Sequence, residues 1–266
     1  MAIDPTAEIH PSAIVEAGAV IGAGCRVGPF SVIGPEVTLG AGVEVKSHAV
    51  VTGWTEIGDE TQVFPFASVG EVPQDLKFAG ERTRLVIGRR NRIREGATLN
   101  TGTEGGGGVT RVGDDCLFMT GAHVGHDAQV GDRVIMANDS ALAGHCIIGD
   151  NVIIGGLSGI HQFVRIGRGA IIGAVTMVTN DVIPYGLVQG PRGRLDGLNL
   201  VGLKRGGVAK EDISALRAAY QELAQGEGAF QERARRLAEE DTDSAYVRDV
   251  VEFVLGASDR SFLTPG

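Results

Sequence analysis

The chain lacks large aromatic side chains, closely spaced cysteines, a positive charge balance and long apolar runs. Aromatic residues make up 5% of its 266 residues, against 43% hydrophobic residues and 41 glycines. A core poor in rings but rich in small and β-branched residues favours repeated narrow strands over a bulky sandwich. The length allows one large domain, or one domain with a smaller appendage.

These absences exclude several classes of protein. A formal net charge of -9 argues against a nucleic-acid binder, because such proteins usually carry a basic balance. No segment approaches the ~18 apolar residues that a membrane-spanning helix needs. Residues 1–10 contain acids and no apolar core, so we expect no secretory signal there. Cys25, Cys116 and Cys146 stand far apart without CxxC spacing, so we expect a reduced, cytoplasmic protein.

An apolar residue recurs at every sixth position over most of the chain. The first run of these anchors is Ile9, Val15, Ile21, Val27, Ile33, Leu39, Val45, Val51, Ile57, Val63 and Val69. After a gap, the same phase continues with Ile87, Ile93 and Leu99. The repeat then slips by one residue and resumes as Val112, Phe118, Val124, Val130, Met136, Leu142, Ile148, Ile154, Ile160, Ile166, Ile172 and Val178.

The residue two positions before each anchor is small or β-branched. Residues two apart on a strand share a face, so the anchor and the small residue both point inward. The three cysteines occupy this small position, and we interpret them as buried small residues rather than reactive thiols. Glycine commonly follows the anchor, which suits a tight turn between strands: Gly22, Gly28, Gly34, Gly40, Gly58, Gly113, Gly131, Gly149 and Gly167. Three hexads, about 18 residues, close one triangular coil of a hexapeptide solenoid.

The repeat also predicts how the chain is divided. We expect a β-helix over residues 1–190, with loop insertions near 70–84 and 100–111, where the anchors are lost or slip. Residues 191–266 form a small α-helical C-terminal domain, because the hexads end after Val178. Helices are expected from about Lys210, over 230–239, and from Thr242 as an N-cap. These helices would cover the open strand edges of the last coil.

Four histidines cluster late in the coil: His123, His126, His145 and His161. His126 follows its anchor by two residues, and one coil later that position is Gly144, about 4.8 Å away along the axis. Imidazole suits proton removal from a hydroxyl, and a backbone N–H at Gly144 could hold a developing oxyanion. Zinc is an alternative, but His123 and His126 are three apart on an extended segment and point to opposite faces, which disfavours chelation.

Six arginines lie within residues 82–94 of this acidic chain: Arg82, Arg84, Arg89, Arg90, Arg92 and Arg94. Such a run can be an ordinary solvated surface. Alternatively, it could dock an acidic partner.

Several segments together closely resemble the bacterial UDP-N-acetylglucosamine 3-O-acyltransferases along nearly the whole chain. They are Ile9-His10-Pro11, Phe66-Ala67-Ser68-Val69-Gly70-Glu71, Gln74-Asp75-Leu76-Lys77, Arg90-Asn91-Arg92-Ile93-Arg94-Glu95, Ala122-His123-Val124-Gly125-His126-Asp127, Leu142-Ala143-Gly144-His145, Ile160-His161-Gln162-Phe163 and Gly202-Leu203-Lys204-Arg205. The resemblance implies an all-β left-handed parallel β-helix, because spacing alone does not determine the hand. It also implies a homotrimer with active sites between neighbouring subunits.

The resemblance further implies that a (3R)-3-hydroxyacyl chain passes from acyl carrier protein to the glucosamine 3-hydroxyl, the first step of lipid A synthesis. His126 would be the general base, Asp127 would orient it, and the Gly144 amide would stabilise the oxyanion. The remaining contacts implied are Gln74, Asp75 and Lys77 at the sugar, His123, His145, His161 and Gln162 at the substrate, Asn199 and Arg205 at the nucleotide, and Arg90, Arg92 and Arg94 at the carrier protein. Neither a metal nor a coenzyme is implied.

Two positions depart from the family pattern. Val201 stands where a member of the family has Glu, and Ala174, the implied floor of the acyl groove, stands where another has Gly. The alternatives are an N-acyltransferase of the same pathway, a coenzyme A-dependent hexapeptide acetyltransferase, a γ-type carbonic anhydrase and a non-catalytic scaffold. The N-acyltransferase is disfavoured because the hexads begin at Ile9, without a preceding nucleotide-binding domain.

Overall fold

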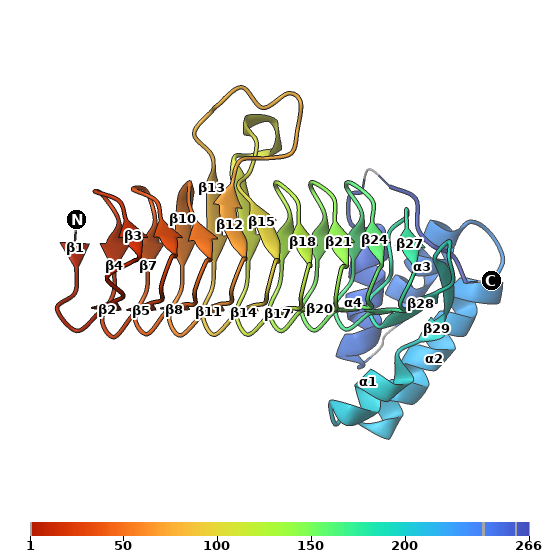
Figure 1. The fold of residues 1–266 in the computed structure, drawn as a ribbon. Helices are drawn as coiled ribbons and strands as arrows, with labels where there is room; N and C mark the ends of the chain where they lie inside the picture. Colours follow the sequence, from red (N-terminus) through yellow and green to blue (C-terminus); the bar gives the residue numbers. More distant parts are fainter. Residues whose placement is uncertain (1, 241–242, 259, 266) are drawn as a thin grey trace.

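The computed structural model describes residues 2–240, 243–258 and 260–265 of the chain. Short strands form three parallel sheets, which are the faces of a left-handed β-helix (Figure 1). Sheet A contains β1 (Ala2–Ile3), β4 (Val20–Ile21), β7 (Thr38–Leu39), β10 (Trp54–Ile57), β13 (Arg84–Ile87), β16 (Val109–Val112), β19 (Gln129–Val130), β22 (Ile147–Ile148) and β25 (Arg165–Ile166).

The other two faces follow sheet A in each coil. Sheet B contains β2 (Glu8–Ile9), β5 (Arg26–Val27), β8 (Glu44–Val45), β11 (Gln62–Val63), β14 (Arg92–Ile93), β17 (Leu117–Phe118), β20 (Ile135–Met136), β23 (Ile153–Ile154), β26 (Ile171–Ile172), β28 (Gly186–Gln189) and β29 (Arg194–Leu198). Sheet C contains β3 (Ile14–Val15), β6 (Val32–Ile33), β9 (Val50–Val51), β12 (Ser68–Glu71), β15 (Thr98–Asn100), β18 (His123–Val124), β21 (Ala141–Leu142), β24 (Gly159–Ile160) and β27 (Met177–Val178).

The predicted anchors are the core of this coil. Each anchor pairs in register with the anchor one coil away, as Val27 does with Val45 and Val45 with Val63. The anchors and small residues from Ala19 to Val178 are buried, which confirms the inward-facing assignment. Burying one of the larger anchor side chains contributes roughly 1.5–3 kcal/mol to the free energy of folding. Ile9 and Val15, at the first coil of the described residues, are only partly buried.

The turns differ from the prediction. The residue with left-handed backbone is the third after the anchor, and it is often not glycine, as at Asp127 (φ 59°) and His145 (φ 61°). Glycine directly after the anchor serves a different purpose. A Cβ on Gly22 would lie 2.7 Å from the carbonyl carbon of Gly40 on the next coil, so glycine permits the corners to stack closely. The requirement at this position is space rather than a turn conformation.

Both interruptions of the repeat lie at the same corner of the prism, between a strand of sheet C and the next strand of sheet A. Residues 72–83 join β12 to β13, and residues 101–108, with the short 3-10 helix η1 (Glu104–Gly106), join β15 to β16. The two loops project from one side of the coil (Figure 1). The Asn100 side-chain amide donates hydrogen bonds to the carbonyls of Glu71 and Val72, which ties the bases of the loops together.

The coil continues past Val178, where the regular hexads end. Val182 forms a bridge to Ile166, and β28 adds to sheet B beside β26. Val182 and Val188 are fully buried and six residues apart, but a shortened turn after Val178 takes them out of the earlier phase. Strand β29 then pairs antiparallel with β28. The predicted domain boundary at residue 190 falls between β28 and β29, which are both strands of sheet B. That boundary stays a prediction.

Four helices gather at the C-terminal end of the solenoid (Figure 1): α1 (Leu200–Arg205), α2 (Lys210–Gln225), α3 (Phe230–Glu239) and α4 (Ala245–Leu255). The predicted helices from Lys210 and over 230–239 are confirmed. Helix α4 begins at Ala245, and Thr242, the predicted N-cap, lies outside the described residues. The edge of sheet B is covered first by β29, which α2 contacts, rather than directly by a helix. Within the described residues, no helix has the length and apolar character needed to cross a membrane.

Candidate active site

The corner between sheets C and A carries most of the side chains that the sequence singled out. We call it the histidine corner. It comprises the turns 125–127, 143–145 and 161–163, which follow β18, β21 and β24, and the two loops that leave the coil there. The His145 N–H donates to the His126 carbonyl (2.9 Å), and the Phe163 N–H donates to the Gly144 carbonyl (3.2 Å). The predicted stacking of successive coils at this corner is therefore confirmed.

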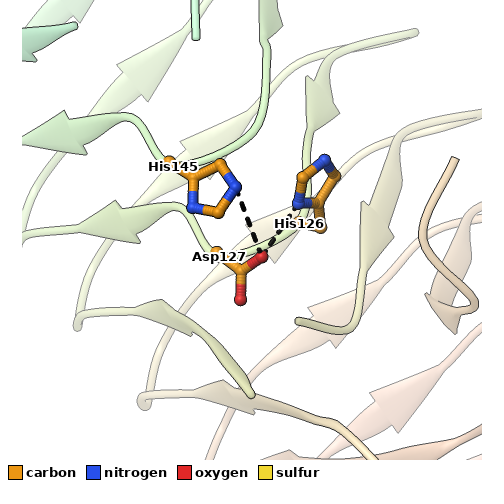
Figure 2. Close-up of side chains that lie close together, drawn as sticks. All are labelled: His126, Asp127 and His145. Atoms are coloured by element: carbon orange, nitrogen blue, oxygen red, sulfur yellow. Dashed lines mark hydrogen bonds and ion pairs between the residues drawn. The ribbon is translucent and has the colours of Figure 1, made fainter. Parts of the chain in front are cut away.

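His126 and Asp127 form a buried hydrogen-bonded pair (Figure 2). His126 Nδ1 lies 2.8 Å from Asp127 Oδ2, and the two side chains are 8% and 1% exposed. The carboxylate accepts a hydrogen bond from Nδ1–H and stabilises an imidazolium, so neutral His126 keeps its lone pair on Nε2. The arrangement gives His126 the geometry of a general base.

Asp127 is in turn held by the loop 101–108. The Thr103 N–H and hydroxyl donate to the Asp127 carboxylate at 2.9 Å and 2.6 Å, and the Thr110 hydroxyl accepts from the Asp127 N–H at 2.7 Å. A Cβ on Gly106 would lie 2.1 Å from the Asp127 carboxyl carbon, so only glycine lets the loop pack this closely. These contacts of Thr103 and Thr110 were not predicted from the sequence. The glycine-rich loop was the available signal, since its insertion coincides with the slip of the repeat.

Gly144 lies against the His126 ring from the next coil. A Cβ at this position would be 2.4 Å from Cε1 and 2.5 Å from Nε2 of His126, so glycine is required for the ring to occupy its place. Gly144 is the second residue after its anchor. Six prolines occupy the same position in other turns, which indicates that its N–H points out of the coil without a ladder partner: Pro5, Pro11, Pro29, Pro35, Pro65 and Pro184. Among the described residues, the Gly144 N–H has no acceptor, and it is available to a ligand beside His126.

His145 completes the cluster drawn in Figure 2. Its Nε2 lies 3.8 Å from Asp127 Oδ2, its ring meets that of His126 edge-on at 5.0 Å, and it stacks on Phe163 at 4.5 Å. Burial lowers the pKa of His145, opposed by the Asp127 carboxylate and, more weakly, by Asp75. Asp75 belongs to the loop 72–83, which leaves the coil at this same corner. Gln74 and Lys77 lie on the same loop, and the Lys77 N–H donates to Asp75 Oδ1 at 3.0 Å.

His123 and His161 line a groove of about 370 Å³ over sheet C. The other lining residues are Ala141, Leu142, Ala143, Gly159, Ile160 and Met177. His123 Nδ1 shares a 2.7 Å hydrogen bond with Thr98 Oγ1, and burial lowers its pKa. His161 Nδ1 accepts from Arg260 at 2.8 Å, while Gln162 is exposed beside it. Apart from the two histidines, the side chains that line this groove are apolar, which suits an acyl chain with a polar group near its reacting end.

The two predicted nucleotide residues lie on another face. Asn199 and Arg205 line a cavity of about 540 Å³ over sheet B, together with Arg133, Arg168 and Val201. Asn199 is the N-cap of α1, where its Oδ1 accepts from the Gly202 N–H at 2.9 Å and its Nδ2 donates to the Gly169 carbonyl at 3.0 Å. Its side chain therefore has a structural role, and the nucleotide contact stays a prediction.

The predicted carrier-protein arginines lie outside both cavities. Arg90 forms a two-point ion pair with Asp115 (2.7 Å at each contact), and Arg94 pairs with its neighbour Glu95 (2.9 Å). Arg92, on β14, is exposed. Docking of an acidic partner stays a prediction. Of these three arginines, Arg92 alone forms no ion pair with another described residue.

Ala174 is exposed in the turn between β26 and β27, three residues before Met177 of the sheet C groove. It does not line that groove in one chain. That Ala174 forms the floor of the acyl groove stays a prediction. It requires a neighbouring copy of the chain to bring this turn to the groove.

His126, Asp127 and His145 also form the one group among the described residues that could hold a metal ion, with ligand atoms within 4.8 Å of one another. The zinc alternative considered from the sequence paired His123 with His126, and the set with Asp127 and His145 was not predicted. However, the Asp127 carboxylate already accepts from Thr103 and contacts His126. A bound metal would have to displace those partners, so the observed hydrogen bonds fit a general-base pair better than a metal centre.

The fold and this site define a hexapeptide-repeat transferase. Residues 18–53 match the family model described as bacterial transferase hexapeptide (six repeats), and residues 181–263 match that of UDP N-acetylglucosamine O-acyltransferase, domain 2. The acyl-[acyl-carrier-protein]–UDP-N-acetylglucosamine O-acyltransferase of Paracoccus denitrificans is 68% identical over 76% of this chain and 77% of its own length. The protein of the same name from Caulobacter vibrioides is 55% identical over 86% and 87%.

A solved structure extends the likeness to the fold. The UDP-N-acetylglucosamine acyltransferase from Campylobacter jejuni superposes with a TM-score of 0.91 at 36% identity, covering 97% of this chain and 100% of that one. This chain belongs to the UDP-N-acetylglucosamine O-acyltransferase family. The family assignment expected from the sequence motifs is confirmed.

Proposed function

We propose that this protein transfers an acyl group from acyl carrier protein to a hydroxyl of UDP-N-acetylglucosamine. Its relatives are named for this donor and this acceptor. The observation that carries the proposal is the His126–Asp127 pair beside Gly144, because acyl transfer to a hydroxyl needs a base and an oxyanion donor within reach of the same carbonyl.

The reaction requires one proton to move in and out of His126. Nε2 removes the proton from the acceptor hydroxyl as its oxygen attacks the thioester carbonyl carbon. The negative charge that develops on the carbonyl oxygen is stabilised by the Gly144 N–H. When the intermediate collapses, the carbon–sulfur bond breaks and the imidazolium returns the proton to the leaving thiolate. Asp127 stays ionised and stabilises the imidazolium throughout.

The finer assignments are part of the same proposal. The acceptor is the glucosamine 3-hydroxyl, the acyl group is a (3R)-3-hydroxyacyl chain, and the product enters lipid A synthesis. Gln74, Asp75 and Lys77 contact the sugar, and Asn199 and Arg205 contact the nucleotide. His123, His145, His161 and Gln162 hold the substrate, Ala174 limits chain length, and Arg90, Arg92 and Arg94 meet the carrier protein.

The two sets of site residues lie on different faces, which supports a ring of identical subunits, and we propose that the ring is a homotrimer. Asn199 and Arg205 line a cavity over sheet B, whereas His126 lies at the corner of sheets C and A, so one chain presents the two ends of the site on different faces. A UDP-sugar could reach both sets only if a second copy brought its sheet B face to the histidine corner. This contact joins two different faces, so it is heterologous. If it repeats around a closed ring, every subunit contributes to two sites and each site is complete.

The unpaired, buried cysteines fit a reducing compartment, and we propose the cytoplasm. Burial raises the pKa of Cys116 and of Cys146 to about 12, so neither is a nucleophile near neutral pH.

The proposal is tested by incubating the protein with UDP-N-acetylglucosamine and a series of hydroxyacyl carrier proteins of different chain length. Mass spectrometry of the product identifies the transferred chain, and a 3-amino analogue of the sugar tests the acceptor group. Product formation that survives a strong chelator is expected. Absence of product with every donor, or activity that follows the content of bound zinc, would contradict the proposal.

A further inference from the structure

The four histidines of the site do not share one kind of partner. His126 Nδ1 meets a carboxylate, which accepts a hydrogen bond from Nδ1–H, whereas His161 Nδ1 meets the guanidinium of Arg260 at 2.8 Å. Arginine stays protonated and offers only donors. A ring nitrogen that accepts from a guanidinium carries no proton of its own, so the proton of neutral His161 lies on Nε2. The two imidazoles therefore hold opposite tautomers.

His161 Nδ1 has a second possible hydrogen-bond partner. His161 Nδ1 also lies 3.3 Å from the Gln162 carbonyl, toward which it could donate in the other tautomer. Arg260 itself donates to that carbonyl through Nε at 3.1 Å. The guanidinium thus serves both acceptors, and the contact to His161 is shorter and charge-assisted. Without Arg260, the balance between the two tautomers would shift toward donation to Gln162.

Arg260 reaches His161 from 99 positions further along the chain, and it is fixed from behind. Its N–H donates to the Ser258 hydroxyl at 3.0 Å, and that hydroxyl donates to Asp181 at 2.6 Å. Asp181 is fully buried and is paired with Arg165 at 2.7 Å. Ser258 and Arg260 are therefore tied to Asp181 of the coil, which holds the backbone from which the Arg260 side chain reaches His161.

We propose that Arg260 is a positioning residue that holds His161 as an obligate hydrogen-bond donor toward a substrate oxygen in the sheet C groove. In this arrangement His126 Nε2 presents a lone pair to a hydroxyl, while His161 Nε2 presents an N–H to a carbonyl, hydroxyl or phosphate oxygen. The inference rests on the proposed function, because it assigns a role within the same site. It adds the C-terminal segment to the groove, which the hexapeptide repeat alone does not predict.

The first test needs no activity. NMR of protein labelled with ¹⁵N-histidine reports which ring nitrogen of neutral His161 is protonated. Wild type is expected to show Nε2–H for His161 and Nδ1–H for His126. The Arg260→Ala variant is expected to lose the Nε2–H preference at His161 alone. A wild-type His161 protonated on Nδ1, or a tautomer unaffected by Arg260→Ala, would overturn the proposal even if the acyltransferase activity were established.

The second test separates positioning from simple support of the fold. Arg260→Ala is expected to lower kcat/KM roughly tenfold, the scale of one hydrogen bond to a charged group, and Arg260→Lys to recover part of the loss. In a His161→Ala background, Arg260→Ala should cost nothing further, because its effect passes through the ring. Equal losses in both backgrounds would mean that Arg260 only anchors the C-terminal segment. Arg235→Ala, an exposed charge change on α3, is the matched control and should leave kcat/KM unchanged.

Discussion

Replacing Gly144 by Ala tests the geometry of the site with a single methyl group. The added Cβ would lie 2.4–2.5 Å from Cε1 and Nε2 of His126, whereas ordinary van der Waals contact begins at 3.4 Å. The two groups must therefore separate by roughly 1 Å, and a displacement of that size at a reacting group can cost about 10²-fold in rate. Since the ring is held by a 2.8 Å hydrogen bond to Asp127, the movement also strains that pair. We expect kcat to fall by about 10²-fold.

The matched control is Gly156→Ala, the same substitution at the same hexad position in the turn after β23. Its Cβ would meet the Asn138 carbonyl oxygen at 3.1 Å, and other turns accept Ala or Asn there. Near-normal turnover is expected. In a His126→Ala background, Gly144→Ala should cause little additional loss in an assay of steady-state kinetics. Normal turnover of the Gly144→Ala single variant, with its fold intact by thermal unfolding, would refute the reasoning.

Three further predictions concern pH, carrier docking and chain length. Burial lowers the pKa of His123 and His145 below the ordinary value of 6.5, so the unfolded state binds protons more readily. The free energy of unfolding should therefore decline as pH falls through and below 6.5. Urea titrations at several pH values measure this, and a double His123→Gln, His145→Gln variant that declines as steeply as wild type would contradict it. Arg92→Glu should raise KM for the carrier protein and weaken the salt dependence of KM without disturbing an internal ion pair. An unchanged KM at low salt would mean that the arginines form an ordinary solvated surface. Ala174→Gly should shift acyl preference toward longer chains and Ala174→Met toward much shorter ones, since one methylene of misfit is worth about 1–3 kcal/mol. If both variants kept the chain-length profile of the wild type, Ala174 would not be the floor of the groove.

The sequence predicted the parts of the molecule that repeat. Anchors spaced by six residues, such as Val27, Val45 and Val63, have only one way to bury themselves together, so the coil and the stacking of His126 with Gly144 followed from spacing. The spacing also indicated where the loops leave the coil, because an inserted loop breaks the phase.

The parts that do not repeat were harder to predict. The contact of Thr103 with Asp127 depends on the path of an irregular loop, and that of Arg260 with His161 depends on how the C-terminal segment returns over 99 residues. The role of glycine after the anchor was also misassigned, because the distance to the next coil, rather than the local backbone, determines it. Strand β29 pairs antiparallel at the end of a parallel coil, and no hexad pattern predicts it.

The central claim is that His126 is the base of an acyltransferase, and the most direct measurement is kcat of His126→Ala with saturating UDP-N-acetylglucosamine and acyl carrier protein. Loss of a general base typically costs 10²–10⁴-fold, so a fall of about 10²-fold or more is predicted, with the assembly state and thermal stability close to those of wild type. Turnover within a few-fold of wild type in a correctly assembled variant would contradict the account.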